Sequence, residues 1–249
     1  METLRCIGLF KSFDSVRAIT NIDLIFPQLG LVAIVGSNGA GKTTLVNILT
    51  GFVQAEEGKC FLGSTEITRL PPHRIAKLGI ARTFQNLRLI LQVSVLDNVM
   101  LARPNQKGEH LLGALFGAGV SKEEARNREQ AVRLLRFVGL EKMKEELAGE
   151  LSYGQQKLLT LACCLATQAR ILLLDEPIAG VHPEMALRIL ELLRTLREDG
   201  KLVVFIEHDI STVRQVADVV IVMEDGRVIA QGSPEEVLTK PEIMEAYLA

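Results

Sequence analysis

The chain has 249 residues, enough to bury a sizeable core, either as one large α/β domain or as a core with an inserted subdomain. Its 28 Lys and Arg residues nearly balance 30 Asp and Glu residues, so the net charge of −2 excludes a strongly basic protein and we expect no nucleic acid partner. The four cysteines lack the paired spacing of a zinc site, and no apolar run approaches the ~18 residues of a membrane-spanning helix. We therefore expect a cytosolic protein, free or held at a membrane by a partner.

The first 35 residues predict β-strands. Residues 4–9 and 21–26 flank a polar turn, and the second segment alternates apolar and polar residues, which predicts a half-exposed antiparallel sheet. Residues 31–35 form an apolar run that predicts a buried strand. Phe13 lies at the turn between the first two strands and has two interpretations, a core side chain or a ring that stacks on a nucleotide base.

A glycine-rich segment follows this apolar run directly. It fits the spacing G-x-x-x-x-G-K-S/T of a phosphate-binding loop and opens onto a predicted helix. Its glycines allow backbone conformations that turn successive N–H groups toward an anion, and the helix aims its positive end at the same point. We expect Lys42 to reach the outer phosphates of a nucleotide and the Thr43 hydroxyl to bind Mg²⁺. The loop consists of Gly36, Ser37, Asn38, Gly39, Ala40, Gly41, Lys42, Thr43 and Thr44.

The next section changes from strands to helices. Residues 58–61 and 66–67 predict another sheet edge, a short helix starts at 71–74, and residues 79–84 predict a strand that ends at Gln85. From 95 to 166 the apolar residues follow mainly helical spacing. This stretch therefore predicts a helical subdomain inserted into the chain.

Two carboxylates follow a later strand. Residues 171–175 are an apolar run that ends in Asp175 and Glu176, as expected when a buried parallel strand delivers acids to the carboxyl edge of a sheet. Beside a phosphate loop, one carboxylate suits Mg²⁺ and the next can deprotonate a water that attacks the γ-phosphate. The strand predicted at 202–206 places His208 at the same edge, where an imidazole N–H can donate to a phosphate oxygen.

Local signals define the remaining elements. Ser152 and Gln155 match a capping box at the start of a helix, and Ser233 begins a second one. Residues 219–230 predict a hairpin that turns at Asp-Gly. The whole pattern predicts an α/β fold, a P-loop NTPase core with a mainly parallel sheet, an N-terminal antiparallel β subdomain and an inserted α-helical subdomain.

We expect residues 1–249 to form a single domain. Its nucleotide-binding core, which includes the β subdomain, is expected at 1–86 and 167–249, and the inserted helical subdomain at 87–166.

The order of these motifs resembles the ATP-binding subunits of ABC transporters, over essentially the whole chain. A phosphate loop occurs in many NTPases, so the specific evidence is the Leu-Ser-Tyr-Gly-Gln element at 151–155, placed shortly before the carboxylate strand. Within that family, the segment at 82–86, the loose insert at 103–122 and the Ile-Glu-His-Asp segment at 206–209 resemble the ATPase subunits of bacterial branched-chain amino acid importers. Relatives of that group belong to transporters of urea or short amides.

The resemblance implies ATP as the nucleotide and a role for several side chains. Phe13 would stack on adenine, with Val16 also at the nucleotide. Glu176 would be the general base, Asp175 would serve Mg²⁺, and His208 would contact the γ-phosphate. Glu207 is a rival base. Side chains alternate between the two faces of a strand, however, so Glu207 is expected to point away from the face of its neighbour His208.

The resemblance also implies an assembly. Gln85 would touch Mg²⁺ or the attacking water and sense a membrane partner, whereas Ser152, Gly154 and Gln155 would act on the nucleotide held by a second subunit. Hydrolysis would then require a head-to-tail pair, formed with an identical chain or a sister ATPase, that encloses two ATP molecules.

Further partners follow from the same resemblance. Integral membrane permease subunits would contact the surface near Gln85 and 87–95, and a substrate-binding protein would take part indirectly. An alternative is that 87–95 packs inside the helical subdomain. The expected location is peripheral, on the cytoplasmic face of the inner membrane.

Three positions depart from the family pattern. His182 stands where Asp or Asn is usual, and Leu158 and Cys163 stand where relatives usually have Arg.

Two other functions stay open. The first alternative function is a soluble ABC ATPase in DNA repair or translation, although such chains usually carry long coiled-coil insertions or two cassettes. The second is an ATPase subunit of a lipid or lipopolysaccharide exporter.

Overall fold

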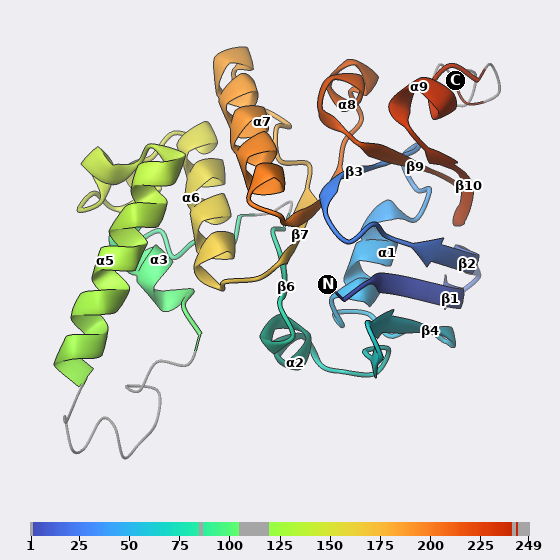
Figure 1. Cartoon of the computed structure of the whole chain (residues 1–249), viewed down its shortest axis with the longest axis horizontal. Helices are drawn as coiled ribbons and strands as arrows, with labels where there is room; N and C mark the ends of the chain where they lie inside the picture. Colours follow the sequence, from blue (N-terminus) through green and yellow to red (C-terminus); the bar gives the residue numbers. More distant parts are fainter. Residues whose placement is uncertain (1, 85–86, 105–119, 241–242, 244–249) are drawn as a thin grey trace. The chain divides into compact units, whose positions relative to one another are not determined.

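The computed structural model describes residues 2–84, 87–104, 120–240 and 243, without the side chains of 120–122. Contacts within the chain divide it into two compact units (Figure 1). The first unit comprises Met1–Arg82, Arg170–Ala179 and Leu187–Ala249, and the second comprises Thr83–Ala169 and Gly180–Ala186.

The first unit contains an antiparallel sheet with the strand order β2-β1-β4-β5. Its strands are β1 (Leu4–Phe13), β2 (Val16–Ile25), β4 (Glu57–Leu62) and β5 (Thr65–Glu66). Residues on β2 alternate between buried and exposed, because only one face of this sheet packs on the core. Cys6 of β1 lies opposite Cys60 of β4, and both thiols are buried in that core. The half-exposed antiparallel sheet expected from the alternation is therefore present.

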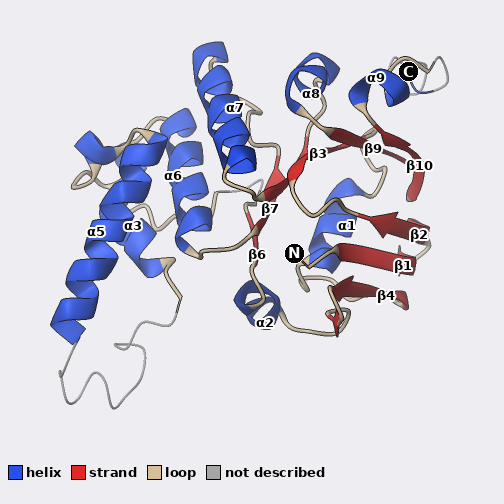
Figure 2. Ribbon diagram, viewed as in Figure 1, coloured by secondary structure: helices blue, strands red, loops and turns tan. Residues whose placement is uncertain are grey.

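The second sheet of this unit is mainly parallel, with the order β10-β9-β3-β8-β7-β6 (Figure 2). Neighbouring strands from β9 to β6 run parallel, and β10 pairs antiparallel with β9. Every residue of β3, β7 and β8 is buried, since an apolar parallel strand needs cover on both faces. The strands are β3 (Gly30–Val35), β6 (Ile80–Arg82), β7 (Ile171–Asp175), β8 (Leu202–Ile206), β9 (Val219–Glu224) and β10 (Arg227–Gly232).

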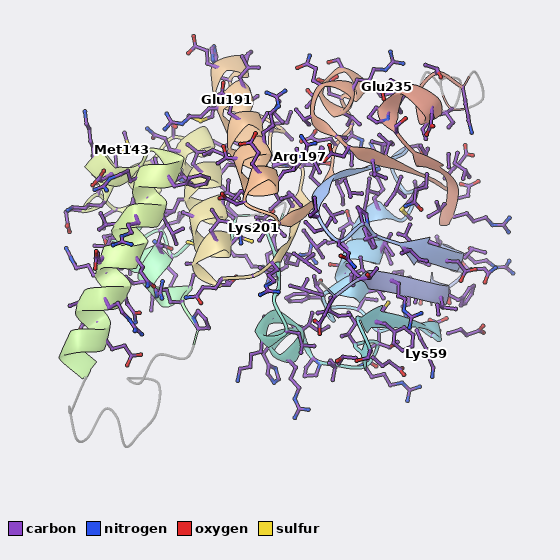
Figure 3. All side chains as sticks on the ribbon, viewed as in Figure 1. Lys59, Met143, Glu191, Arg197, Lys201 and Glu235 are labelled. Carbon is purple, nitrogen blue, oxygen red and sulfur yellow. The ribbon has the colours of Figure 1, made fainter. Side chains whose placement is uncertain are left out.

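Helices and both sheets share one hydrophobic core in the first unit. Leu45 and Ile48 of α1 belong to the same buried cluster as Leu9 of β1 and Ile34 of β3. Lys59, a charged residue labelled in Figure 3, is exposed outside this core. The helices of this unit are α1 (Lys42–Leu49), α2 (Pro72–Lys77), α8 (Ile210–Val216), α9 (Pro234–Val237) and the larger part of α7 (Pro183–Glu198).

The second unit is helical. It contains α3 (Val95–Leu101), α5 (Val120–Val138) and α6 (Tyr153–Ala166), which pack on one another, and two short 3-10 helices at Glu141–Met143 and Ala148–Glu150. Leu135 and Val138 are buried on α5, as its helical spacing predicts. Among the described residues, no helix has the length and apolar composition to cross a lipid bilayer.

Two details differ from the sequence expectation. The strand expected at 79–84 ends at Arg82. Helix α8 is not anticipated by hydrophobic spacing, but Asp209 caps it by accepting hydrogen bonds from the N–H of Ser211 at 2.9 Å and the hydroxyl of Thr212 at 2.7 Å. An Asp placed immediately before a helix is the signal that identifies this start.

Candidate functional site

The glycine-rich loop connects β3 to α1 in the first unit, as the motif predicts. Gly36 and Gly41 have φ of 153° and 93°. A Cβ on Gly36 would lie 2.1 Å from the carbonyl oxygen of Met223, and a Cβ on Gly41 would lie 2.3 Å from that of Ala18. Both contacts are with backbone atoms, so these positions require glycine for close approach as well as for conformation.

The start of α1 offers backbone N–H groups to an anion. Gly41 is the N-cap residue and supplies no side-chain acceptor, and the first turn carries no acidic side chain. Ser37, Asn38 and Thr43 are exposed around this helix end. Unsatisfied N–H groups and the helix dipole together favour a phosphate at this point.

Lys42 spans the loop. Its Nζ donates hydrogen bonds to the carbonyl oxygens of Gly36 and Ser37, both at 2.8 Å. Burial lowers the pKa of Lys42, while the carboxylates of Glu176 and Asp175 act in the opposite direction. The side chain thus places a cation among the loop carbonyls, where it can exchange these acceptors for phosphate oxygens.

Glu176 and His208 meet at the carboxyl edge of the parallel sheet. Asp175 ends β7 opposite Ile206, the last residue of β8, so the residues that follow the two strands lie together. Nε2 of His208 is 2.8 Å from Oε1 of Glu176. Glu176 has a φ of 48°, which is uncommon for a residue with a side chain and typical of functional sites. The structure therefore brings together the expected acid and the expected histidine.

Asp175 is the more buried of the two neighbouring acids. Its side chain is 3% exposed and lies 3.6 Å from Nη2 of Arg82. Burial raises the pKa of Asp175, and the negative charge of Glu176 adds to this, whereas Arg82, Lys42 and His208 oppose it. The carboxylate is therefore buried at the edge of the sheet beside the guanidinium of Arg82.

Glu207 has a different environment from Glu176. It is only 4% exposed, and its Oε1 accepts a hydrogen bond from the backbone N–H of Ile178 at 3.2 Å. A buried acid that fixes a neighbouring loop has a structural role. This contact weighs against Glu207 as the rival base.

The oxygen donors suit Mg²⁺. In the described residues no group of three or more His, Cys, Asp or Glu side chains is arranged to hold a metal ion. Mg²⁺ is usually bound through one or two protein oxygens together with substrate phosphates, so the hydroxyl of Thr43 and the carboxylate of Asp175 fit the ion. Gln85, the third expected ligand, lies outside the described residues.

Phe13 is an exposed side chain at the end of β1. Its side chain is 45% exposed, that of Val16 is 66% exposed, and the two residues pair across the turn. Nζ of Lys11 lies 5.1 Å from the centroid of the Phe13 ring. The interpretation of Phe13 as a core residue is wrong, since the turn leaves its ring in solvent.

The second unit carries the remaining candidates. The predicted capping box at α6 is present, because the N–H of Ser152 donates to Oε1 of Gln155 at 2.8 Å and the N–H of Gln155 donates to Oγ of Ser152. A Cβ on Gly154 would lie 2.8 Å from Cγ of Met185. Ser152 is exposed at this helix start.

The three departures from the family pattern have separate environments. Leu158 is buried on α6, where a charged side chain would need a partner. Burial raises the pKa of Cys163 to about 12, so this thiol is not a reactive thiolate. His182 is exposed just before α7.

The comparison with protein families decides the identity of the fold. The family described as ABC transporter matches residues 19–179, more than half of the chain. The chain belongs to the ABC transporter family.

Full-length relatives in this family are transport ATP-binding proteins. The chain is 37% identical over 248 residues to a probable branched-chain amino acid transport ATP-binding protein of Archaeoglobus fulgidus, covering 100% of this chain and 96% of the relative. It is 36% identical over 247 residues to a high-affinity branched-chain amino acid transport ATP-binding protein of Pseudomonas aeruginosa, covering 98% and 97%. The main functional prediction is thus supported over its alternatives.

Solved structures agree with the observed fold. A nucleotide-free ATP-binding cassette from an ABC transporter superposes with a TM-score of 0.87 at 33% identity, covering 100% of both chains. A cassette in its ADP conformation gives 0.85 at 33% identity, covering 100% of this chain and 99% of the other. A dimeric cassette in a post-hydrolysis state with ADP and Pi gives 0.78 at 26% identity, covering 93% and 98%. The predicted fold class is confirmed, and this ABC ATPase is a nucleotide-binding cassette.

Proposed function

We propose that this ABC ATPase energises an importer of branched-chain amino acids by binding and hydrolysing ATP. The observation that carries the substrate class is the identity of 37% to a branched-chain amino acid transport ATP-binding protein across the full length of this chain. The ATPase subunit does not contact the transported molecule, so no side chain of this chain selects it.

The phosphate loop is the proposed site of the ATP phosphates. Residues 36–44 surround them with N–H groups, and Lys42 leaves the carbonyl oxygens of Gly36 and Ser37 to donate to phosphate oxygens. Phe13 and Val16 are the proposed contacts of the adenine, because both side chains are exposed at one turn.

The edge of the parallel sheet is the proposed site of catalysis. Thr43, Asp175 and Gln85 would hold Mg²⁺, which would neutralise charge on the phosphates when bound. Glu176 accepts a proton from the attacking water, while the N–H of His208 donates to an oxygen of the γ-phosphate. The 2.8 Å contact between Glu176 and His208 supports this assignment, since both groups reach one point.

A second ATPase subunit, identical or sister, completes the proposed site. Ser152, Gly154 and Gln155 contact the nucleotide bound by that subunit. The exposure of Ser152 at the amino end of α6 supports this, because the start of a helix favours an anion. The dimeric assembly of the cassette solved with ADP and Pi supports such a pair.

The segment at 87–95 is the proposed contact with integral membrane permease subunits. Ile90 is 47% exposed and Leu91 is 44% exposed, so these two side chains do not pack inside the second unit. Asn98 fixes the segment, because its Oδ1 accepts from the N–H of Ile90 at 2.9 Å and its Nδ2 donates to the carbonyl of Ile90 at 3.0 Å. A rigid loop with two exposed apolar side chains suits a protein partner.

The proposed location follows from that contact. The chain is peripheral, on the cytoplasmic face of the inner membrane, and meets a substrate-binding protein only through the permease. We propose the nucleotide-binding core at 1–86 and 167–249 and the inserted helical subdomain at 87–166. The contacts within the chain also group residues 83–84, 167–169 and 180–186 with the helical unit.

Reconstitution tests this function. The chain and its co-expressed permease in liposomes are expected to take up leucine, isoleucine or valine with ATP inside and the binding protein outside. Urea and acetamide serve as comparison substrates. Uptake of urea or acetamide in place of branched-chain amino acids would contradict the substrate class, and loss of all uptake in Glu176→Gln with retained assembly would support the role of this chain.

A further inference from the structure

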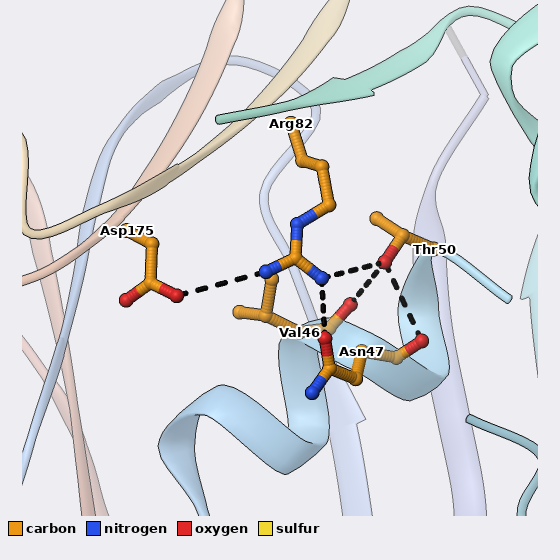
Figure 4. A network of polar contacts seen from close by, with 5 residues as sticks. All are labelled: Val46, Asn47, Thr50, Arg82 and Asp175. Atoms are coloured by element: carbon orange, nitrogen blue, oxygen red, sulfur yellow. Dashed lines mark hydrogen bonds and ion pairs between the residues drawn. The ribbon is translucent and has the colours of Figure 1, made fainter. Parts of the chain in front are cut away.

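Arg82 is a buried arginine beside the candidate metal site. It is the last residue of β6, and its side chain is only 6% exposed. Arginine stays charged in proteins, so burial of its guanidinium requires partners. The guanidinium lies between α1 and the end of β7, two elements of the same unit (Figure 4).

Its two terminal nitrogens face different elements. Nη1 donates to Oδ1 of Asn47 and, at 3.3 Å, to Oγ1 of Thr50 on the carboxyl side of α1. Nη2 lies 3.6 Å from Oδ2 of Asp175. The guanidinium of Arg82 thereby links α1 to the carboxylate of Asp175.

One of these acceptors, Thr50 at the carboxyl end of α1, is itself oriented. The hydroxyl of Thr50 donates to the carbonyl oxygen of Val46 at 2.7 Å, so its oxygen can present a lone pair to Arg82. The ring of Phe52 is 5.5 Å from the guanidinium carbon and adds a cation–π contact. The position of the guanidinium is therefore set from the side of α1, independently of Asp175.

We propose that Arg82 is a positioning residue for the metal site: anchored on α1 by Asn47 and Thr50, it fixes the carboxylate of Asp175 in the orientation that binds Mg²⁺. The inference depends on the proposed metal role of Asp175. Thr43, the other proposed ligand in the described residues, is also on α1. Arg82 thus sets the distance between Thr43 and Asp175, two proposed ligands from distant parts of the sequence.

A purely electrostatic role and a positioning role of Arg82 predict opposite changes in metal affinity. A guanidinium near a divalent cation repels it, so a purely electrostatic role means that removal of Arg82 tightens metal binding. Positioning by a residue that contacts a ligand means that removal weakens metal binding, typically by about 10- to 100-fold. The sign of the change separates the two roles.

Binding of Mn²⁺, followed by electron paramagnetic resonance in the presence of a non-hydrolysable ATP analogue, tests this. We expect Arg82→Ala to raise the Kd for Mn²⁺ by about 10-fold or more. Arg82→Lys keeps the charge but lacks the fork, so its affinity is expected to stay below that of the wild type. Arg170→Ala is the matched control, because Arg170 is exposed before the other end of β7. Affinity for the analogue without metal is expected to be unchanged in all three variants.

The inference is overturned if folded Arg82→Ala binds Mn²⁺ as tightly as the wild type or more tightly, or if Arg82→Lys restores full affinity. If Arg82→Ala does not fold, Asn47→Ala removes one anchor of the guanidinium, and unchanged affinity there overturns the inference as well. Asp175→Asn distinguishes failure of the metal role of Asp175 from failure of the positioning role of Arg82. Retained Mn²⁺ binding in that variant refutes the metal role of Asp175 together with the inference, whereas its loss there, with wild-type binding in Arg82→Ala, refutes only the positioning role.

Discussion

Replacing Glu176 with glutamine removes a proton acceptor while keeping the size of the side chain. The carboxylate lies 2.8 Å from Nε2 of His208, and an amide of the same length can keep this hydrogen bond. A general base contributes at least about 100-fold to the rate, which corresponds to about 2.7 kcal/mol in the activation free energy. We therefore expect kcat for ATP hydrolysis to fall by about 100-fold or more with little change in ATP affinity.

The assay combines steady-state phosphate release, which gives kcat, with ATP titration. Uncleaved ATP is expected to hold two subunits together, so Glu176→Gln should elute as a dimer in ATP and Mg²⁺ while the wild type elutes mostly as a monomer. Glu207→Gln is the matched control, because Glu207 is buried and accepts a hydrogen bond from Ile178. Wild-type hydrolysis in Glu176→Gln together with its loss in Glu207→Gln would refute the assignment.

Three other changes have different expected results. Phe13→Ala is expected to weaken ATP binding by about 5-fold or more through loss of stacking, with an unchanged melting temperature because the ring is exposed; equal affinity by titration counts against the adenine contact. Replacing Ile90 and Leu91 by serine is expected to abolish co-purification with the permease and leave ATP affinity intact; retained co-purification excludes this surface. Asp209→Ala is expected to lower the free energy of unfolding by about 1 kcal/mol at pH 7, measured by urea titration. Hydrogen bonds from Thr212 and Ser211 lower the pKa of Asp209 in the folded protein. The difference in free energy of unfolding between the wild type and Asp209→Ala is therefore complete above the usual pKa range of Asp and disappears as pH falls through the lowered pKa. A difference that grows in acid would contradict the cap.

Much of the site was predictable because the sequence carries short-range signals for it. The phosphate loop has a fixed spacing, and the apolar run before Asp175 identifies a buried strand that ends in acids. Parallel pairing of β7 and β8 then brings Glu176 and His208 together. Each step needs only local pattern and the rule that carboxyl ends of parallel strands share an edge.

Other features depend on tertiary contacts that local patterns do not encode. Arg82 belongs to the segment that resembles importer subunits, but its partners Asn47 and Asp175 come from distant parts of the chain. The burial of Glu207 depends on a loop contact with Ile178, which follows a different strand. Such environments follow from how the strands pack, and only the folded structure supplies them.

ATP titration of the purified chain and of Lys42→Ala is the most direct test that this cassette uses residues 36–44 to bind ATP. Lys42 supplies a side-chain cation within the loop, where its Nζ contacts the carbonyl oxygens of Gly36 and Ser37. Lys59→Ala is the matched control, because Lys59 is exposed on β4. We predict that ATP binding is lost in Lys42→Ala and retained in Lys59→Ala, whereas wild-type affinity in Lys42→Ala would contradict the account.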